Sequence, residues 1–372
     1  MLKTYADYAA TTPLSERVFD TLCRTSREVF GNPSSAHSFG RDAADVVSRA
    51  REQTAALLGC DPDEIVFTSG GTEADNHALR CAAGMPVLTS AIEHPAVLNA
   101  ARAMASRVYF AEPDSGGCVS AEEIAHILRG APEIAMVSLM YANNETGVIQ
   151  PVREAAYAAH SAGALFHCDA VQGTGHVMPD VRTLDCDLLS VSGHKFHAPK
   201  GIGALYVNRR IAGRVPPFHY GGGQEHGLRS GTLPVPLIAA FGEACAEALE
   251  RRDDDDRRIR CLRERMADEL LTIPGSRRIG QGRTMPGILN IAFEGTYGEN
   301  LMLLCDLRGV SLSTGSACHA GDDTPSHVLT AMRVPEEYRT SSVRISIGRY
   351  TTDEEAERIT ETLRDCVMLA RG

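Results

Sequence analysis

Apolar and polar positions along the chain follow two alternating patterns. Residues 41–58 place their apolar side chains on one helical stripe, which Gly59 ends. A turn then leads into 65–68, a short apolar run typical of a buried strand. Similar runs follow at 86–90, 108–110, 133–140, 164–169, 187–192 and 204–207, with helical stretches between most of them. Strands that alternate with helices predict an α/β fold whose mostly parallel sheet is covered on both faces.

The pattern changes at about Pro236, where a long helix is expected to begin. The charged run 250–258 is expected to break this helix. We interpret the run as a solvent-exposed helix face near a domain junction. Beyond it the chain predicts strands at 288–293, 310–313 and 343–347, a helix at 299–308, and a last helix capped by Thr352 and Glu355. We expect a large domain over 15–250 and a smaller α+β domain formed by 1–14 and 251–372.

Composition narrows the class of protein. With 43% hydrophobic and 23% charged residues, the chain is an ordinary globular protein, and disorder is excluded. The sequence contains neither a membrane-spanning apolar run nor a secretory signal, so a cytoplasmic location is expected. A formal net charge of −11 argues against nucleic-acid or anionic-membrane binding. The 11 cysteines are scattered without metal-ligand spacing, which indicates a reducing compartment and no metal site.

Polar residues follow several predicted strands, where open α/β sheets bind ligands. The glycine-rich turn 68–73 opens a helix whose N–H groups could hold an anion, although it matches neither a P-loop nor a dinucleotide fingerprint. Asp169 ends a buried strand, and Lys195 follows Ser192 and His194 after another. Taken singly, each has a simpler explanation as a turn, a capping residue or a surface lysine. Together they supply the three groups that hold pyridoxal phosphate (PLP): an anion cradle, a carboxylate and a lysine.

The sequence resembles a cysteine desulfurase of the class V aminotransferase family, with PLP fold type I. The motifs that carry the resemblance are ordered along nearly the whole chain, at residues 7–12, 31–35, 68–76, 93–98, 143–147, 169–172, 192–195, 221–225, 229–232, 315–318 and 343–346. The resemblance implies a large α/β/α sandwich domain, a homodimer and L-cysteine as substrate.

The resemblance also implies a cofactor site. Its residues would contact the ring, the phenolic oxygen or the phosphate: Gly71, Thr72, His94, Asn144, Asp169, Gln172, Ser192, His194, Lys195 and Thr232. Lys195 would bind PLP covalently, His94 would stack on the ring, and Thr232 would come from the second subunit. Arg344 and Asn144 would bind the substrate carboxylate, and Asn32 would line the substrate entrance.

The resemblance implies that Cys318, the last residue of the motif 315–318, is the nucleophile among the cysteines. Small residues flank it, and His319 could lower the pKa of its thiol if charged. It would take sulfur from cysteine as a persulfide and leave L-alanine. The Cys318-His319 pair is also similar to selenocysteine lyases, so L-selenocysteine is the alternative substrate. A class V aminotransferase-type lyase would not need this thiol. A further alternative is a non-catalytic subunit of the same fold that serves as a scaffold for partners. The presence of Lys195, Asp169 and His94 argues against it, because such a subunit would not need them.

His226 stands where the family resemblance leads us to expect arginine, a change of local charge that removes no catalytic residue. A second feature leaves the sulfur acceptor open: the chain ends soon after Arg344, and we expect it to lack the longer tail with which some relatives dock an iron–sulfur scaffold protein. We therefore expect a sulfur-acceptor protein without naming it. Iron–sulfur assembly, tRNA thiolation, cofactor synthesis and DNA modification all remain possible pathways.

Overall fold

The computed structural model describes residues 3–178, 180–315 and 326–372. Its largest element is a seven-stranded sheet with the order β2-β8-β7-β6-β5-β3-β4. The strands are β2 (Ile65–Thr68), β3 (Pro86–Ser90), β4 (Arg107–Ala111), β5 (Met136–Ser138), β6 (Leu165–Asp169), β7 (Leu188–Ser192) and β8 (Gly203–Val207). β8 runs antiparallel to the other six strands, which are parallel to one another, and this confirms the predicted α/β fold with a mostly parallel sheet.

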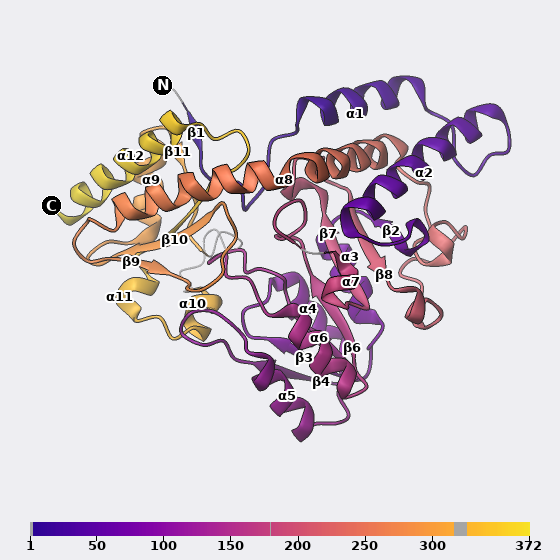
Figure 1. Ribbon diagram of the computed structural model, residues 1–372, viewed down its shortest axis with the longest axis horizontal. Coiled ribbons are helices and arrows are strands. Elements are labelled where there is room, and N and C mark those ends of the chain that lie inside the picture. Colours follow the sequence, from indigo (N-terminus) through magenta and orange to yellow (C-terminus); the bar gives the residue numbers. More distant parts are fainter. Residues whose placement is uncertain (1–2, 179, 316–325) are drawn as a thin grey trace.

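Helices cover both faces of the sheet (Figure 1). Apolar residues of α3 (Gly71–Arg80) and α4 (Pro95–Met104) pack against one face. The other face packs against α2 (Ser38–Leu58), α5 (Ala121–Gly130), α6 (Val152–Ser161), α7 (Val181–Leu184) and the first half of α8 (Val235–Leu270). Neighbouring strand residues such as Leu188 and Leu189 belong to opposite clusters, because successive side chains of a strand point to opposite faces. Burial on both faces explains the continuous apolar runs.

A second, antiparallel sheet has the order β12-β10-β9, from β9 (Ser276–Ile279), β10 (Ile288–Phe293) and β12 (Ser342–Ser346). Apolar side chains on one face of this sheet form a separate cluster with the second half of α8, α9 (Gly298–Leu307) and α12 (Asp353–Arg371). Two short helices, α10 (His327–Ala331) and α11 (Glu336–Arg339), precede β12. The N-terminal strand β1 (Thr4–Tyr5) pairs with β11 (Val310–Ser311), so the chain's start lies with its C-terminal third.

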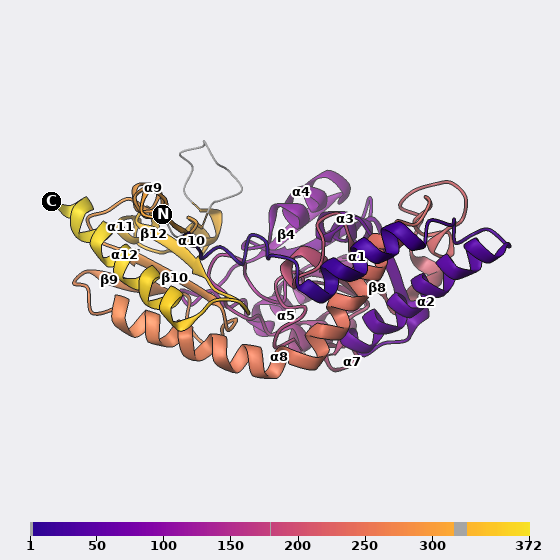
Figure 2. The same cartoon turned by 90° about the horizontal axis from the view of Figure 1, so that it is seen from above.

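Helix α8 corrects one expectation. It is continuous over 36 residues, and the charged run does not interrupt it. Figure 2 shows it running along both parts of the molecule. Most of the run is solvent-exposed, but Asp256 is buried and its carboxylate bonds to His176 at 3.0 Å. Glutamate and arginine have good helix propensity, and the modest cost of the four aspartates is offset by the buried turns on both sides of the run. The predicted domain boundary at 250/251 falls inside α8, and the division into domains stays a prediction.

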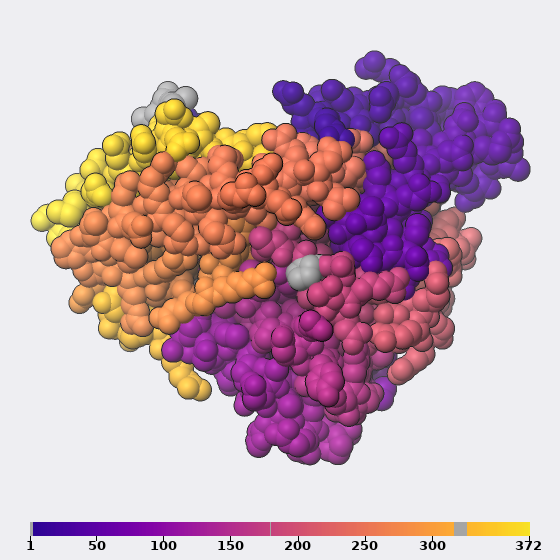
Figure 3. All heavy atoms as spheres, in the orientation of Figure 1, coloured from indigo at the N-terminus to yellow at the C-terminus, as the bar shows by residue number. Residues whose placement is uncertain are grey.

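The element limits otherwise follow the sequence closely. β5 is shorter than predicted, although Leu139 and Tyr141 still donate backbone hydrogen bonds to β6. The capping box of Thr352 and Glu355 is present at α12. In Figure 3 the C-terminal residues (yellow) and the N-terminal residues that include α1 (Glu16–Glu28) and α2 (indigo) lie on opposite sides of the molecule. No helix in the described ranges is long and apolar enough to cross a membrane.

Candidate active site

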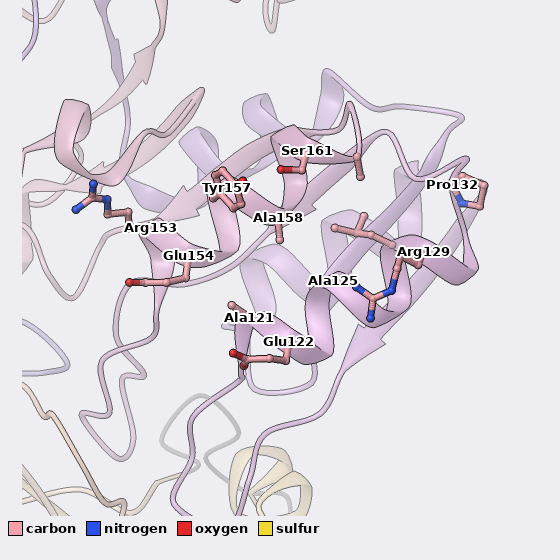
Figure 4. A pocket seen from close by; sticks show the side chains of 12 residues that line it. Ala121, Glu122, Ala125, Arg129, Pro132, Arg153, Glu154, Tyr157, Ala158 and Ser161 are labelled. Carbon is pink, nitrogen blue, oxygen red and sulfur yellow. The ribbon is translucent and has the colours of Figure 1, made fainter.

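A cavity of about 280 Å³ lies where the carboxyl ends of β6 and β7 face the N-terminus of α3. It brings together ten of the residues predicted for the site: Gly71, Thr72, His94, Asn144, Asp169, Gln172, Ser192, His194, Lys195 and Arg344. A larger groove of about 710 Å³ lies between α5 and α6 and is lined mainly by small side chains and exposed charges (Figure 4). It holds none of the predicted site residues, so the smaller cavity is the candidate active site.

Lys195 enters the cavity from a short turn that follows β7. Its ammonium group donates hydrogen bonds to the carbonyl oxygens of Ala9 at 2.7 Å and Ala10 at 3.0 Å. The turn is compact at Gly193, where a Cβ atom would lie 2.9 Å from both Ala198 and Phe241. The N-terminal segment therefore holds the amine in the cavity, where it can react with a carbonyl group.

Asp169 ends β6 and is buried. Its Oδ1 accepts the Val171 N–H at 2.9 Å, and burial raises the pKa of this carboxyl to about 6, although the Val171 N–H and the charge of Lys195 oppose the rise. A cation beside Asp169 would favour its ionised form. The structure adds a residue that the sequence analysis did not assign, Asp75 on α3. Burial and the charge of Asp169 raise the pKa of the Asp75 carboxyl. Asp75 lies one turn into the helix that follows the glycine-rich turn, and this position in the sequence could have identified it as a site residue.

The N-terminus of α3 forms an anion cradle. Gly70 has a φ of +150°, a backbone conformation that favours glycine, and no side chain caps the helix. At Gly71 a Cβ atom would lie 2.6 Å from the Val171 side chain, so only glycine fits. Thr72, Ser192 and His194 border the same end of the cavity, with His194 Nδ1 at 3.2 Å from Thr11 Oγ1. Backbone N–H groups with hydroxyl neighbours favour a phosphate here.

His94 and Gln172 line the cavity from two different segments, the N-terminus of α4 and the turn that follows β6. His94 caps α4, where its Nδ1 accepts the Ala96 N–H at 3.1 Å. Burial, with the charges of Lys195 and His327, lowers the pKa of His94 to about 4, so its ring is neutral at pH 7. Gln172 Nε2 donates to the Ala9 carbonyl at 2.9 Å. A neutral, partly buried ring is suited to stacking on another planar ring.

Arg344 on β12 supplies a buried positive charge. Its guanidinium contacts the Asp7 carboxylate at 2.7 Å and donates to the Asn144 carbonyl at 3.0 Å. The sequence analysis placed Asp7 in a motif but gave it no role. Since Arg344 is only 3% exposed, its Asp7 partner offsets the cost of burying the charge. A carboxylate ligand entering the cavity would meet the same guanidinium.

Three predicted residues are not assembled in this cavity. Asn32, in the turn between α1 and α2, and Thr232, before α8, are both exposed and do not line the cavity of their own chain. Cys318 lies outside the described residues. The cavity does reach the residue that precedes that gap, because Gly315 is part of its lining.

Known proteins place this arrangement in context. A cysteine desulfurase IscS of Methanosarcina thermophila is 39% identical over 99% of this chain and 93% of its own. A solved NifS-like protein aligns over 99% of this chain and all of its own, with 32% identity and a TM-score of 0.91. A structure described as SspA in complex with cysteine covers 94% of this chain and all of its own, with 33% identity and a TM-score of 0.82. Residues 4–359 match the aminotransferase class-V family, and the chain belongs to that family, with cysteine desulfurases among its relatives.

Proposed function

We propose that this protein is a PLP-dependent cysteine desulfurase that converts L-cysteine to L-alanine and places the sulfur on Cys318. The observation that carries the proposal is one cavity that combines the Lys195 amine, the Asp169 carboxyl, the α3 N-terminus and the Arg344 guanidinium. The first three fit PLP, and the fourth fits an amino-acid carboxylate. The relatives named cysteine desulfurase support the choice of substrate.

Each side chain has a distinct task in this proposal. Asp169 would hold the ring nitrogen in its protonated form, and Gly71, Thr72, Ser192 and His194, which line the same cavity, would hold the phosphate. When bound, PLP supplies an electron sink for bonds at the substrate α-carbon. Lys195 would hold the cofactor covalently, and its amine is placed to move a proton at the substrate α-carbon. Arg344 exchanges its Asp7 contact for the substrate carboxylate and so fixes the orientation of the amino acid.

Sulfur transfer needs a second nucleophile. The Cys318 thiolate attacks the substrate sulfur, an S–S bond forms, and the substrate Cβ–S bond breaks. The electron pair of that bond stays with carbon, which gains a proton as alanine is formed. The product on the protein is a Cys318 persulfide, which a sulfur-acceptor protein removes.

Two variants test the proposal. The wild-type protein should bind PLP in a borohydride-reducible link, and Lys195→Ala should lose that link. Cys318→Ser should still bind PLP and respond spectrally to L-cysteine but form neither alanine nor persulfide, because a serine hydroxyl does not ionise at neutral pH. Wild-type protein that takes up no PLP, or Cys318→Ser protein that desulfurates cysteine normally, would contradict the proposal. Parallel assays with L-selenocysteine test the alternative substrate.

The homodimer belongs to the same proposal. Exposed aromatic residues lie near both site residues in the sequence: Phe30 and Phe39, whose rings contact each other, lie on either side of Asn32, and Tyr220 precedes Thr232. Exposed apolar side chains grouped in this way are typical of an interaction surface. A second copy of the chain would cover them and bring Thr232 to the cofactor phosphate. The cytoplasmic location stays a prediction from the sequence, for cell fractionation to test.

A further inference from the structure

Glu73 is an acidic residue in the first turn of α3, directly beside the anion cradle. It lines a second cavity of about 490 Å³, which shares Gly71, Thr72, Ser192 and His194 with the candidate active site. The Glu73 side chain is only 10% exposed. A carboxylate at this place repels a phosphate unless its charge is compensated, so the partners of Glu73 matter for the cradle.

Both carboxylate oxygens of Glu73 have partners outside the helix. Oε2 accepts the Ser69 N–H at 3.1 Å and also the Ser69 hydroxyl. Oε1 accepts Arg229 Nε at 2.9 Å, and Nη2 of the same guanidinium donates to Oε2 at 3.4 Å. Burial would raise the pKa of Glu73, but the hydrogen bonds from Arg229 and Ser69 outweigh burial and lower it, so Glu73 is ionised at neutral pH. The Arg229 guanidinium compensates this charge.

These contacts differ from those of an ordinary helix cap. A glutamate at the third position of a helix commonly bonds to the N-cap N–H, and an acidic residue in the first turn stabilises any helix. Here the N-cap is Gly70, and Glu73 bonds instead to Ser69, the residue before it. Within the described residues no side chain caps α3. Glu73 therefore fixes the turn without occupying the first N–H groups of the helix.

Arg229 is itself held in a closed loop, and its side chain is 18% exposed. The residues on either side of it are both bonded. The Phe218 N–H donates to the Leu228 carbonyl at 2.7 Å, and the Gly223 N–H donates to Ser230 Oγ at 3.2 Å. An ion pair between groups that are already fixed loses less side-chain entropy than one between mobile surface groups. The loop therefore gives Glu73 a fixed partner.

We propose that Glu73 and Arg229 are positioning residues for the cofactor phosphate, which hold the turn 68–72 so that the first N–H groups of α3 are oriented for the ligand. The inference rests on the proposed function. Neither side chain needs to contact the phosphate, because Arg229 neutralises Glu73 and Glu73 fixes the turn. The pair should therefore contribute to the affinity for the phosphate group and not to that for the pyridine ring.

The test compares the affinities for PLP and for pyridoxal, which has the same ring and aldehyde but no phosphate. Protein freed of cofactor with hydroxylamine is titrated with each compound and followed by absorbance. Arg229→Ala should weaken PLP binding at least about tenfold, because it leaves an uncompensated carboxylate beside the phosphate. Glu73→Gln should weaken PLP binding by about threefold, since its amide oxygen can still accept a hydrogen bond. Both variants should leave the pyridoxal affinity within about twofold.

A double variant separates charge from shape. Glu73→Gln combined with Arg229→Ala removes both charges, so it should bind PLP more tightly than Arg229→Ala alone. The control is an ion pair at the opposite end of β2, between Asp63 and Arg209, whose side chains are 56% and 63% exposed. Asp63→Asn and Arg209→Ala should change both affinities by less than about twofold.

Several results would overturn the inference. Equal losses of PLP and pyridoxal affinity would show a general structural role, and wild-type PLP affinity in Arg229→Ala would show no role. A double variant no better than Arg229→Ala would also contradict it. If Arg229→Ala does not fold, Arg229→Gln and Glu73→Gln decide, and normal PLP affinity in both excludes the role. Wild-type protein that binds neither compound removes the proposed function and this inference together, whereas normal wild-type binding with unaffected variants removes the inference alone.

Discussion

At the scale of single residues, burial sets the charge state of the site. The pKa of Glu93 rises to about 8 and that of Asp169 to about 6, because the protein interior disfavours the ionised carboxyl. The same burial keeps His94 and His167 neutral by lowering their pKa values to about 4 and about 3. Lys195 and Arg344 bring positive charge to the cavity, while Asp169 faces the place where the cofactor ring nitrogen is proposed to bind.

Asp169→Asn tests the carboxylate beside the ring nitrogen. The amide keeps the size of the side chain but cannot hold the ring nitrogen protonated as an ion pair. We expect the variant to fold and bind PLP, with desulfuration reduced at least about 100-fold. Alanine formation and cofactor absorbance measure the two effects, with Asp253→Asn, an exposed change on α8, as control. Near-normal turnover in Asp169→Asn would place the partner of the ring nitrogen elsewhere.

His167 gives a pH prediction. It is buried between Ser138 Oγ at 2.8 Å and Ser190 Oγ at 3.0 Å. Its pKa is about 3 in the folded protein, against about 6.5 when unfolded, so the unfolded chain gains a proton first as the pH falls. His167 therefore lowers stability progressively below pH 6.5. His167→Gln should be less stable than wild type at pH 7.5, and that difference should shrink by about 2 kcal/mol at pH 5. Urea unfolding at both pH values measures it, and an unchanged difference would refute the prediction.

At the scale of elements, the strands position the side chains of the cavity, and the helices bury the sheet from which those side chains come. Asp169 ends β6 and Lys195 follows the neighbouring parallel strand β7, so their side chains lie at the same edge of the sheet. The cradle glycines lie after β2, which the antiparallel strand β8 separates from β7. Helix α8 connects this sheet to the second one, since its two halves pack in different apolar clusters.

The charged run within α8 contains two aspartates that differ in burial, so one can serve as the control for the other. Asp256 is buried and bonded to His176, whereas the side chain of Asp253 is 89% exposed. Asp256→Ala should lower the free energy of unfolding by about 1–3 kcal/mol, because it leaves a partly buried imidazole without its partner. Asp253→Ala should change it by less than about 0.5 kcal/mol. Chemical denaturation compares the two, and equal effects would show that the His176 contact contributes nothing.

At the scale of the whole molecule, one chain forms a cavity that lacks two of its predicted contacts. Asn32 and Thr232 are exposed on surfaces that also carry exposed aromatic side chains. In a two-fold dimer each chain would supply the same residues to its partner, so both sites would be completed at once. Sedimentation should show a dimer.

Mixing two inactive variants tests shared sites directly. In a heterodimer of Lys195→Ala and Thr232→Ala chains, one site carries both changes and the other carries neither. After subunit exchange, equal amounts should regain about one quarter of the wild-type activity, since half of the dimers are mixed and half of their sites are intact. Each variant alone and the unexchanged mixture are the controls. Failure to recover activity after proven exchange would place Thr232 outside the partner's site.

The sequence by itself determined the α/β class, nearly all strand positions and the motif residues of the cavity. These features depend on local patterns: apolar runs, capping residues and short polar motifs at strand ends. Only the tertiary structure decided the pairing of Arg344 with Asp7, the second buried carboxyl at Asp75, the continuity of α8 and the contact of Glu73 with Arg229. These depend on residues far apart in the chain, and their burial and electrostatic partners exist only once the chain has folded.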